Sequence, residues 1–180
     1  MTGTLKTNRL ILCAFFATLT VVGTIISIPL PFSPVPINMA LLSVFLAGSL
    51  LGAEFGALSQ LVYICLGAAG LPVFSKFSGG AAILAGPTGG YIIGYIAAAF
   101  LVGLITQKSV SFGPKTILGF LAGLAACYAL GTLWFIYVTE TTLWAALLMC
   151  VIPSLPGEGV KIFLAFILTK KLRPFIKMSN

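Results

Sequence analysis

The sequence has very few charged residues and lacks two residue types on which much enzyme chemistry depends. Charged residues make up 7% of the 180 residues, and there is no histidine. Aspartate is absent as well, because the three acidic residues are Glu54, Glu140 and Glu158. A typical soluble domain carries about 25% charged residues, and so few charges cannot cover a surface that faces water. These absences exclude a soluble fold and predict an integral membrane protein.

The same absences remove the common catalytic and metal-binding arrangements. No nucleophile lies at a suitable spacing from a base, and no glycine-rich stretch is followed by the Lys-Ser/Thr pair of a phosphate-binding loop. The cysteines lie far apart within apolar runs and are expected to be small buried hydrophobic residues rather than metal ligands. They are Cys13, Cys65, Cys127 and Cys150. We therefore expect no catalytic residue, no metal and no cofactor, and we predict that the chain is not an enzyme.

Long apolar runs fill most of the chain, which is 59% hydrophobic with a mean hydropathy of +1.16. A bilayer core requires about 20 apolar residues per helix. We expect one all-α membrane domain, 1–180, with six transmembrane helices at about 10–28, 38–52, 55–69, 90–106, 116–138 and 156–172, and a short helix at about 143–152. The second and third helices are short for spanning helices, so we expect a thinned region of bilayer or a tilted hairpin there.

The basic residues indicate which way the helices run. Eight of the ten lysines and arginines fall in the N-terminal segment, in the loop 108–115 and in the C-terminal tail, whereas the other two are Lys76 and Lys161. Because basic residues accumulate on the cytoplasmic side, we expect both termini in the cytoplasm. The proline-rich segment 29–36, the glycine-rich loop 67–90 and the turn at Pro156 would then be irregular loops on the outer face.

One polar signal within the apolar runs is Pro156-Gly157-Glu158-Gly159-Val160-Lys161. Glu158 and Lys161 are three residues apart and therefore share one face of the last helix. Glu158 also lies in the first turn, where the helix dipole favours an anion. Ionisable residues inside a membrane segment are by default a hypothesis of function, and a self-satisfied ion pair at the interface is the alternative. The pair offers a charged donor and a charged acceptor to a polar ligand.

A second polar corner, Gly86-Pro87-Thr88-Gly89-Gly90-Tyr91, opens the fourth helix. Thr88 can cap this helix, and the glycines would let backbone N–H groups approach an anion such as a carboxylate at the helix N-terminus. An ordinary capped helix start is the alternative. Asn38 is either a cap of the second helix or a side chain that faces the same site.

Aromatic and small residues lie near these corners and on the first helix. Flat aromatic side chains suit a compact apolar ring with a polar edge, although plain packing is the commoner role for any one of them. The aromatic candidates are Tyr91, Tyr63, Phe74, Phe77 and Phe32. On the first helix, Ala14 and Thr18 form a small-xxx-small pair that permits close helix packing, and packing within the chain is the alternative to a partner contact.

Together these motifs resemble one family. Gly70-Leu71-Pro72-Val73-Phe74, then Gly79-Gly80, then Gly86-Pro87-Thr88-Gly89-Gly90-Tyr91 are similar to the central signature of the BioY family, the biotin-specific S components of energy-coupling factor (ECF) transporters. The segments 31–36 and 156–161 match its flanking motifs. The resemblance implies a six-helix protein of the prokaryotic plasma membrane that captures biotin with high affinity from outside. It implies as partners a membrane coupling subunit, the T component, and two cytoplasmic ATPase subunits.

The resemblance also implies roles for individual residues. With the two polar corners, it makes the candidate substrate-binding residues Glu158, Lys161, Tyr91, Gly86, Pro87, Thr88, Gly89, Gly90, Asn38, Phe74, Gly79 and Gly80. The candidates for contact with the coupling subunit are Ala14, Ala17 and Thr18 on the first helix. The family usually has aspartate where this chain has Glu158, which keeps the carboxylate but displaces it by one methylene. It also more often has an alanine pair on the first helix, where Thr18 stands here.

Two other hypotheses follow from the residues. A solitary or ion-coupled carrier of another small vitamin would need ionisable residues within the membrane, and only Glu158 and Lys161 are available for that purpose. A membrane-embedded enzyme that modifies lipids is disfavoured by the absence of histidine and aspartate and of a second carboxylate near Glu158.

Overall fold

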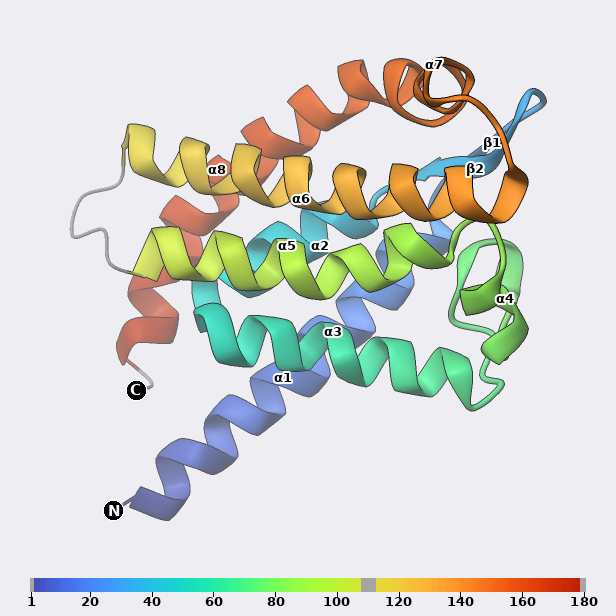
Figure 1. The fold of residues 1–180 in the computed structure, drawn as a ribbon. Coiled ribbons are helices and arrows are strands. Elements are labelled where there is room, and N and C mark those ends of the chain that lie inside the picture. The colour runs from blue at the N-terminus through green and yellow to red at the C-terminus, as the bar shows by residue number, and fades with distance from the viewer. Residues whose placement is uncertain (1, 108–112, 179–180) are drawn as a thin grey trace.

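The computed structural model describes residues 2–107 and 113–178 of the chain. Long helices run along most of the molecule, and a β-hairpin with several short helical turns closes one end (Figure 1). In chain order the elements are α1 (Thr2–Ile25), β1 (Ser27–Leu30), β2 (Ser33–Asn38), α2 (Ala40–Leu51), α3 (Ala53–Ala68), η1 (Ser75–Phe77), α4 (Ala81–Ala85), α5 (Gly89–Gln107), α6 (Pro114–Thr139), α7 (Leu143–Ala146), η2 (Leu147–Val151), η3 (Ile152–Ser154) and α8 (Leu155–Met178).

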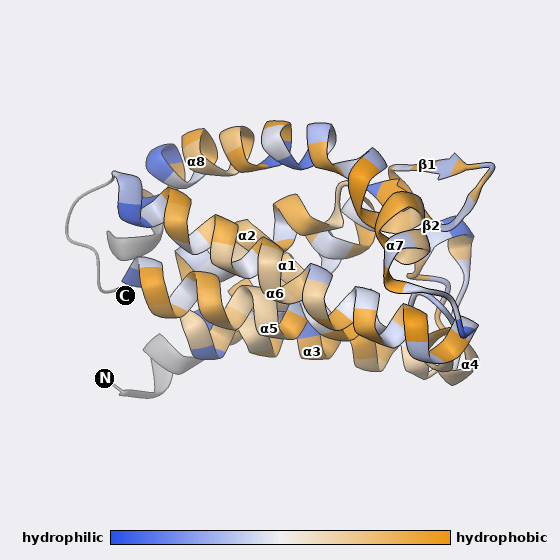
Figure 2. Cartoon of the chain, turned by 45° about the horizontal axis from the view of Figure 1, so that its top comes forward, coloured by the Kyte–Doolittle hydropathy of each residue, from blue (hydrophilic) through white to orange (hydrophobic). Residues whose placement is uncertain are grey.

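Within the described residues, four helical stretches are long and apolar enough to cross a membrane: Thr7–Ile25, Gly89–Gln107, Pro114–Thr139 and Leu143–Phe175. α2 and α3 are apolar but shorter. At about 1.5 Å per residue, the 12 residues of α2 extend about 18 Å, against a bilayer core of about 30 Å. Hydrophobic residues cover most of the helical surface (Figure 2), and the helical membrane fold predicted from composition is confirmed.

The proline-rich segment forms an antiparallel hairpin, which the sequence analysis did not predict. α1 ends at Ile25, before the expected position 28, and β1 begins at Ser27. The two strands pair Ser27 with Asn38 and, at the turn, residues 30 and 33. Proline lacks a backbone N–H and is tolerated at sheet edges, and both strands of a two-stranded ribbon are edges. The prolines therefore end the helix and still permit a ribbon.

The segment 143–178 is a run of helical pieces with an irregularity at residues 147–154. α7 passes into the π-helical turn η2 and the 3₁₀ turn η3 before α8 begins at Leu155. α8 continues to Met178, past the expected end at 172, with Pro174 inside it. π-helical turns within helices are frequent at functional sites, and Cys150 of η2 reaches the cavity described below.

α5 lies between α6 and α3 near the middle of the bundle (Figure 1). Two glycines bring the neighbouring backbones close to it. A Cβ atom at Gly103 of α5 would overlap the backbone nitrogen of Ala53, and one at Gly48 of α2 would overlap the carbonyl oxygen of Ala99. Small residues permit the close approach on which helix packing in lipid depends. This packing fixes α5, which carries Tyr91 into the cavity.

The ends of the chain lie at one end of the bundle, and the hairpin, α4 and α7 lie at the other (Figure 1). The start of α1, the start of α6 and the end of α8 lie toward the terminal end (Figure 1), and these segments contain Arg9, Lys115 and Lys170. Most of the predicted basic loop 108–115 lies outside the described residues. The side of the membrane that each end faces stays a prediction from the positive-inside rule.

Two of the three residues expected to meet a partner on α1 face outward. Ala14 and Thr18 are exposed, and the hydroxyl of Thr18 donates to the carbonyl oxygen of Ala14 at 3.0 Å. Ala17 is 2% exposed and packs in the core. Adjacent residues of a helix point about 100° apart, so Ala17 points inward where Thr18 points outward. In this structure Ala17 is therefore not available for the predicted contact.

Candidate functional site

A cavity of about 190 Å³ lies at the hairpin end of the bundle. Segments that are far apart in sequence form its walls, from β2 and α3 through η1, α5 and α6 to η2 and α8. The polar and charged side chains in the lining are Thr24, Asn38, Ser75, Lys76, Ser78, Thr88, Ser154, Glu158 and Lys161, with the tyrosines 63, 91, 95 and 128. The site therefore combines polar and charged groups with aromatic walls, and such a combination can orient a small molecule.

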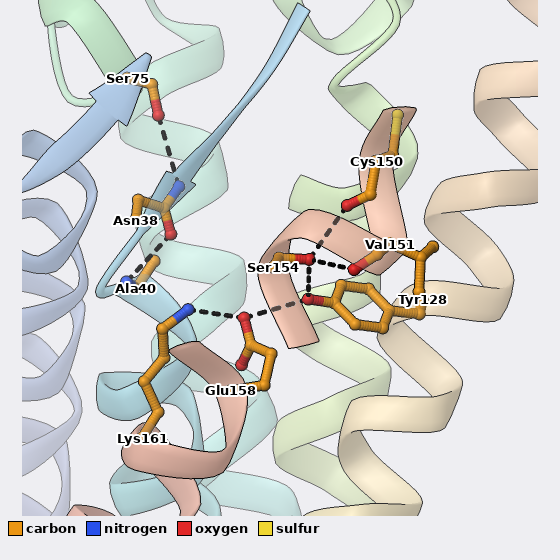
Figure 3. Close-up of polar contacts among 9 residues, drawn as sticks. All are labelled: Asn38, Ala40, Ser75, Tyr128, Cys150, Val151, Ser154, Glu158 and Lys161. Atoms are coloured by element: carbon orange, nitrogen blue, oxygen red, sulfur yellow. Dashed lines mark hydrogen bonds and ion pairs between the residues drawn. The ribbon is translucent and has the colours of Figure 1, made fainter. Parts of the chain in front are cut away.

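Glu158 and Lys161 form a buried ion pair in the wall of this cavity (Figure 3). Nζ of Lys161 donates to Oε1 of Glu158 at 2.6 Å, and each residue is 3% exposed. The three-residue spacing predicted this pair, and Glu158 lies in the first turn of α8, where the helix dipole stabilises a carboxylate. A buried ion pair is weak evidence for stability, because desolvation offsets its attraction. Its place in a cavity wall points instead to ligand binding.

Tyr128 contacts the carboxylate of Glu158 from the other side, and Ser154 contacts Tyr128 (Figure 3). Oη of Tyr128 donates to Oε1 of Glu158 at 3.0 Å and lies 2.8 Å from Oγ of Ser154. Ser154 Oγ also lies 3.0 Å from the carbonyl oxygen of Cys150 and 2.8 Å from that of Val151. An ionised carboxylate can only accept, so the phenol proton points to Glu158 and the hydroxyl of Ser154 can donate to the phenol oxygen of Tyr128. Oε1 of Glu158 thereby accepts hydrogen bonds from two donors, Tyr128 and Lys161.

The second carboxylate oxygen of Glu158, Oε2, is buried and has no hydrogen-bond partner among the described residues. The ammonium group of Lys161 has three N–H donors, and one of them meets Oε1. An unpartnered buried polar atom costs about 1–3 kcal/mol, and more when it is charged. The pair is therefore complementary to a ligand that supplies an N–H to Oε2 and an acceptor to Lys161.

Aromatic rings form the sides of the cavity. Tyr63 packs edge-on against Phe74 with ring centroids 5.6 Å apart, and its ring lies 6.3 Å from that of Tyr95. Tyr91 packs edge-on against Tyr128 at 6.0 Å. These rings come from α3, the residue before η1, α5 and α6, and all five residues line the cavity. Such walls suit a compact, mainly apolar ring.

Six of the twelve predicted substrate-binding residues line the cavity, namely Asn38, Phe74, Thr88, Tyr91, Glu158 and Lys161. Asn38 both supports the start of α2 and reaches the cavity. Its Oδ1 accepts from the backbone N–H of Ala40 at 3.1 Å, and its Nδ2 donates to Oγ of Ser75 at 3.4 Å. Asn38 thus ties the hairpin to η1. Two of the aromatic candidates, Phe32 and Phe77, are 55% and 66% exposed and do not line the cavity.

The other six predicted residues lie outside the lining, namely Gly79, Gly80, Gly86, Pro87, Gly89 and Gly90. Gly89 and Gly90 permit close packing. A Cβ atom at Gly89 would overlap the carbonyl oxygen of Leu84, and one at Gly90 would overlap the side chain of Trp134. Gly80 has φ of 99°, a conformation that glycine adopts without strain. Close packing at Gly89 and Gly90 and the positive φ at Gly80 therefore explain why these positions are glycine, and no role in ligand binding is required.

Some of the backbone N–H groups at the start of α5 are used within the chain. The N–H of Gly89 donates to the carbonyl oxygen of Gly86 at 3.0 Å, and the N–H of Tyr91 donates to that of Thr88 at 3.1 Å. The alternative of an ordinary helix start fits this backbone. The side chains of Thr88 and Tyr91 do line the cavity.

Sequence reasoning missed Tyr95, Tyr128, Ser154 and the cavity position of Lys76. Tyr95 follows Tyr91 by four residues and so shares its helix face. Tyr128 is a phenol within the apolar helix 116–138, where a buried hydroxyl requires a partner. These two signals were available in the sequence. The contact of Ser154 with Tyr128 joins residues 26 positions apart and follows from the fold alone.

Comparisons of the sequence and of the structure with known proteins all point to the same family. A family model described as the BioY family matches residues 1–178. A protein of Thermotoga maritima named "Biotin transporter BioY" is 48% identical over 124 residues, 69% of this chain and 72% of that protein. A "Probable biotin transporter BioY" of Pyrococcus horikoshii is 38% identical over 169 residues, 94% of this chain and 98% of that protein. A crystal structure of "the S-component for biotin from an ECF-type ABC transporter" aligns with a TM-score of 0.85 at 31% identity, and covers 97% of this chain and 95% of that one.

Proposed function

This chain belongs to the BioY family, and we propose that it binds biotin in the cavity that Glu158 and Lys161 line. It is a multi-pass membrane transporter for biotin, the S component of an ECF transporter, and not an enzyme. The observation that carries the site assignment is the buried Oε2 of Glu158, which has no partner within the described residues. The ammonium group of Lys161 beside it has N–H donors other than the one that contacts Oε1.

Biotin has chemical groups that match this pair. Its ureido ring carries N–H donors and a carbonyl acceptor, and its apolar side chain ends in a carboxylate. A ureido N–H would donate to Oε2 of Glu158, and Lys161 would donate to the ureido carbonyl. The fused ring would lie between the aromatic walls around Tyr63 and Tyr91. A neutral head group thereby satisfies both charged partners without adding a net charge to a buried site.

Titration of the purified chain with a panel of vitamins tests this function. We expect biotin to bind without any nucleotide, and riboflavin and thiamine not to bind, because neither carries a cyclic urea on a small saturated ring system. Calorimetry in detergent would measure the affinities. Tighter binding of another vitamin than of biotin would contradict the proposal and favour a carrier of different specificity.

Tyr128 is expected to position Glu158 for the ureido ring. Tyr128→Phe removes the hydroxyl that donates to Oε1 at 3.0 Å. We predict a loss in biotin affinity of about 2- to 13-fold, which corresponds to one hydrogen bond of ~0.5–1.5 kcal/mol. Tyr137→Phe is the matched control, because Tyr137 lies on the same helix and is 79% exposed. Calorimetry would measure both variants.

A double-mutant cycle distinguishes positioning from a general effect on folding. If Tyr128 acts through Glu158, Tyr128→Phe should have little effect in a chain that already carries Glu158→Gln. The same loss of affinity in both backgrounds would show that Tyr128 acts independently of the carboxylate.

We further propose that a membrane T component and two cytoplasmic ATPase subunits drive transport, with both termini in the cytoplasm. The excess of basic residues at the terminal end supports this orientation in the plasma membrane. The cavity end would then face the outside, where biotin is captured. The outward face of α1 at Ala14 and Thr18 is the proposed contact with the T component, since small side chains allow close helix approach.

A further inference from the structure

We infer that Lys76 binds the carboxylate of the ligand at the rim of the cavity, an inference that rests on the proposed binding of biotin. Lys76 lies in η1 and is exposed, whereas Glu158 and Lys161 are buried in the wall. All three residues line the same cavity. The cavity therefore has a buried, paired polar end and an exposed cation, which matches a ligand with a neutral ring at one end and a carboxylate at the other.

The charges in the lining do not balance. Among the described residues, the lining contains Lys76, Lys161 and Glu158 as its charged side chains. Lys161 and Glu158 neutralise each other at 2.6 Å, and this is the one salt bridge found in the described part of the chain. Lys76 thus leaves the cavity with one cation in excess, which favours a ligand of single negative charge. Because the ureido ring is neutral, that charge must lie on the tail of the ligand.

The backbone holds Lys76 in a conformation that few residues adopt. Lys76 has φ of 61° and Phe77 has φ of 54°, a left-handed region that is uncommon for residues other than glycine. The turn is closed by a hydrogen bond from the N–H of Phe74 to the carbonyl oxygen of Ser78 at 2.9 Å, and Phe74 is 1% exposed. Such strain persists where the surroundings impose it, and it clusters at ligand clamps.

The other candidate for the carboxylate is the start of α5, where two of the backbone donors are occupied. The N–H groups of Gly89 and Tyr91 donate to the carbonyl oxygens of Gly86 and Thr88. An anion that bound these two N–H groups would have to displace those bonds. Lys76 can meet the carboxylate without breaking any hydrogen bond seen in the structure.

A comparison of biotin with biotinamide isolates the contribution of the carboxylate to binding. In biotinamide a neutral primary amide replaces the carboxylate, and the ring system is unchanged. We would titrate both into the purified chain and into Lys76→Asn, because asparagine is uncharged and tolerates positive φ. We expect Lys76→Asn to weaken biotin binding about 3- to 15-fold, between the effects of an exposed ion pair and of a charged hydrogen bond. Biotinamide should bind both proteins equally.

Two further variants serve as controls. Lys76→Arg keeps the charge and should keep the preference for biotin over biotinamide. Lys115→Asn removes an exposed lysine at the opposite end of the bundle and should change neither affinity, which excludes an effect of net charge.

An equal loss for both ligands in Lys76→Asn would overturn the inference, because the lysine would then act through the shape of the loop. An unchanged affinity for biotin would overturn it as well, because the carboxylate would then lie elsewhere. Failure of the unaltered chain to bind either ligand would instead refute the proposed function itself.

Discussion

Lys161→Ala is expected to weaken biotin binding by about 5- to 150-fold, equivalent to ~1–3 kcal/mol for a buried polar group left without its partner. The substitution removes the proposed donor to the ureido carbonyl. It also leaves the carboxylate of Glu158 with Tyr128 as its remaining donor among the described residues. Glu158→Ala should cause a loss of similar size, because the proposed acceptor for the ureido N–H disappears. Calorimetry of the purified variants measures both effects.

Loss of binding must be separated from loss of folding. Breaking a buried ion pair is destabilising because it leaves one charge uncompensated, whereas removal of both partners is much less so. The double variant Glu158→Ala/Lys161→Ala should therefore be more stable to heat than either single variant and should still fail to bind biotin tightly. Lys170→Ala, an exposed lysine of the same helix, is the control and should bind biotin normally. Normal affinity in both single variants would show that this pair is not the binding site.

Biotin uptake by liposomes that contain this chain is expected to require the coupling module and ATP. The sequence has no nucleotide-binding motif, so the energy for transport has to come from a partner or from an ion gradient, and we propose the partner. With a T component and two ATPase subunits present, ATP on the cytoplasmic side should drive accumulation of biotin. With the chain alone, uptake should equal that of empty liposomes. The uptake of radiolabelled biotin would be measured for both kinds of liposome.

The control for this experiment is an ATPase variant that binds but does not hydrolyse ATP, and it should reduce uptake to background. Accumulation that follows an imposed proton gradient without the module would contradict the proposal. It would support the alternative of an ion-coupled carrier. Lys161→Ala in the complete complex should lower uptake at low biotin concentrations, because capture rather than energy supply is impaired.

The sequence predicted those features that depend on composition and on local spacing. Low charge and long apolar runs predicted the membrane helices, and the spacing of Glu158 and Lys161 predicted their contact at 2.6 Å. The proline-rich segment was expected to end the first helix, and it does. Its pairing into a hairpin was not predicted, because proline lacks a backbone N–H and is confined to edge strands.

The roles of the glycines could not be read from the sequence. A glycine at a helix start is compatible both with an anion site and with close packing of a neighbour. Only the positions of Leu84 and Trp134, which a Cβ at Gly89 or Gly90 would overlap, decide between them. Likewise, Lys76 appeared as a lone basic residue in a loop, and its place at the cavity rim depends on the fold of η1.

A structure of this chain with biotin bound would show where the ureido ring lies. We expect a ureido nitrogen within hydrogen-bond distance of Oε2 of Glu158, about 2.7–3.2 Å, and the ureido oxygen within the same distance of Nζ of Lys161. A biotin ring outside the cavity, or one in the cavity with Oε2 of Glu158 still unpartnered, would contradict the proposed binding of biotin by Glu158 and Lys161.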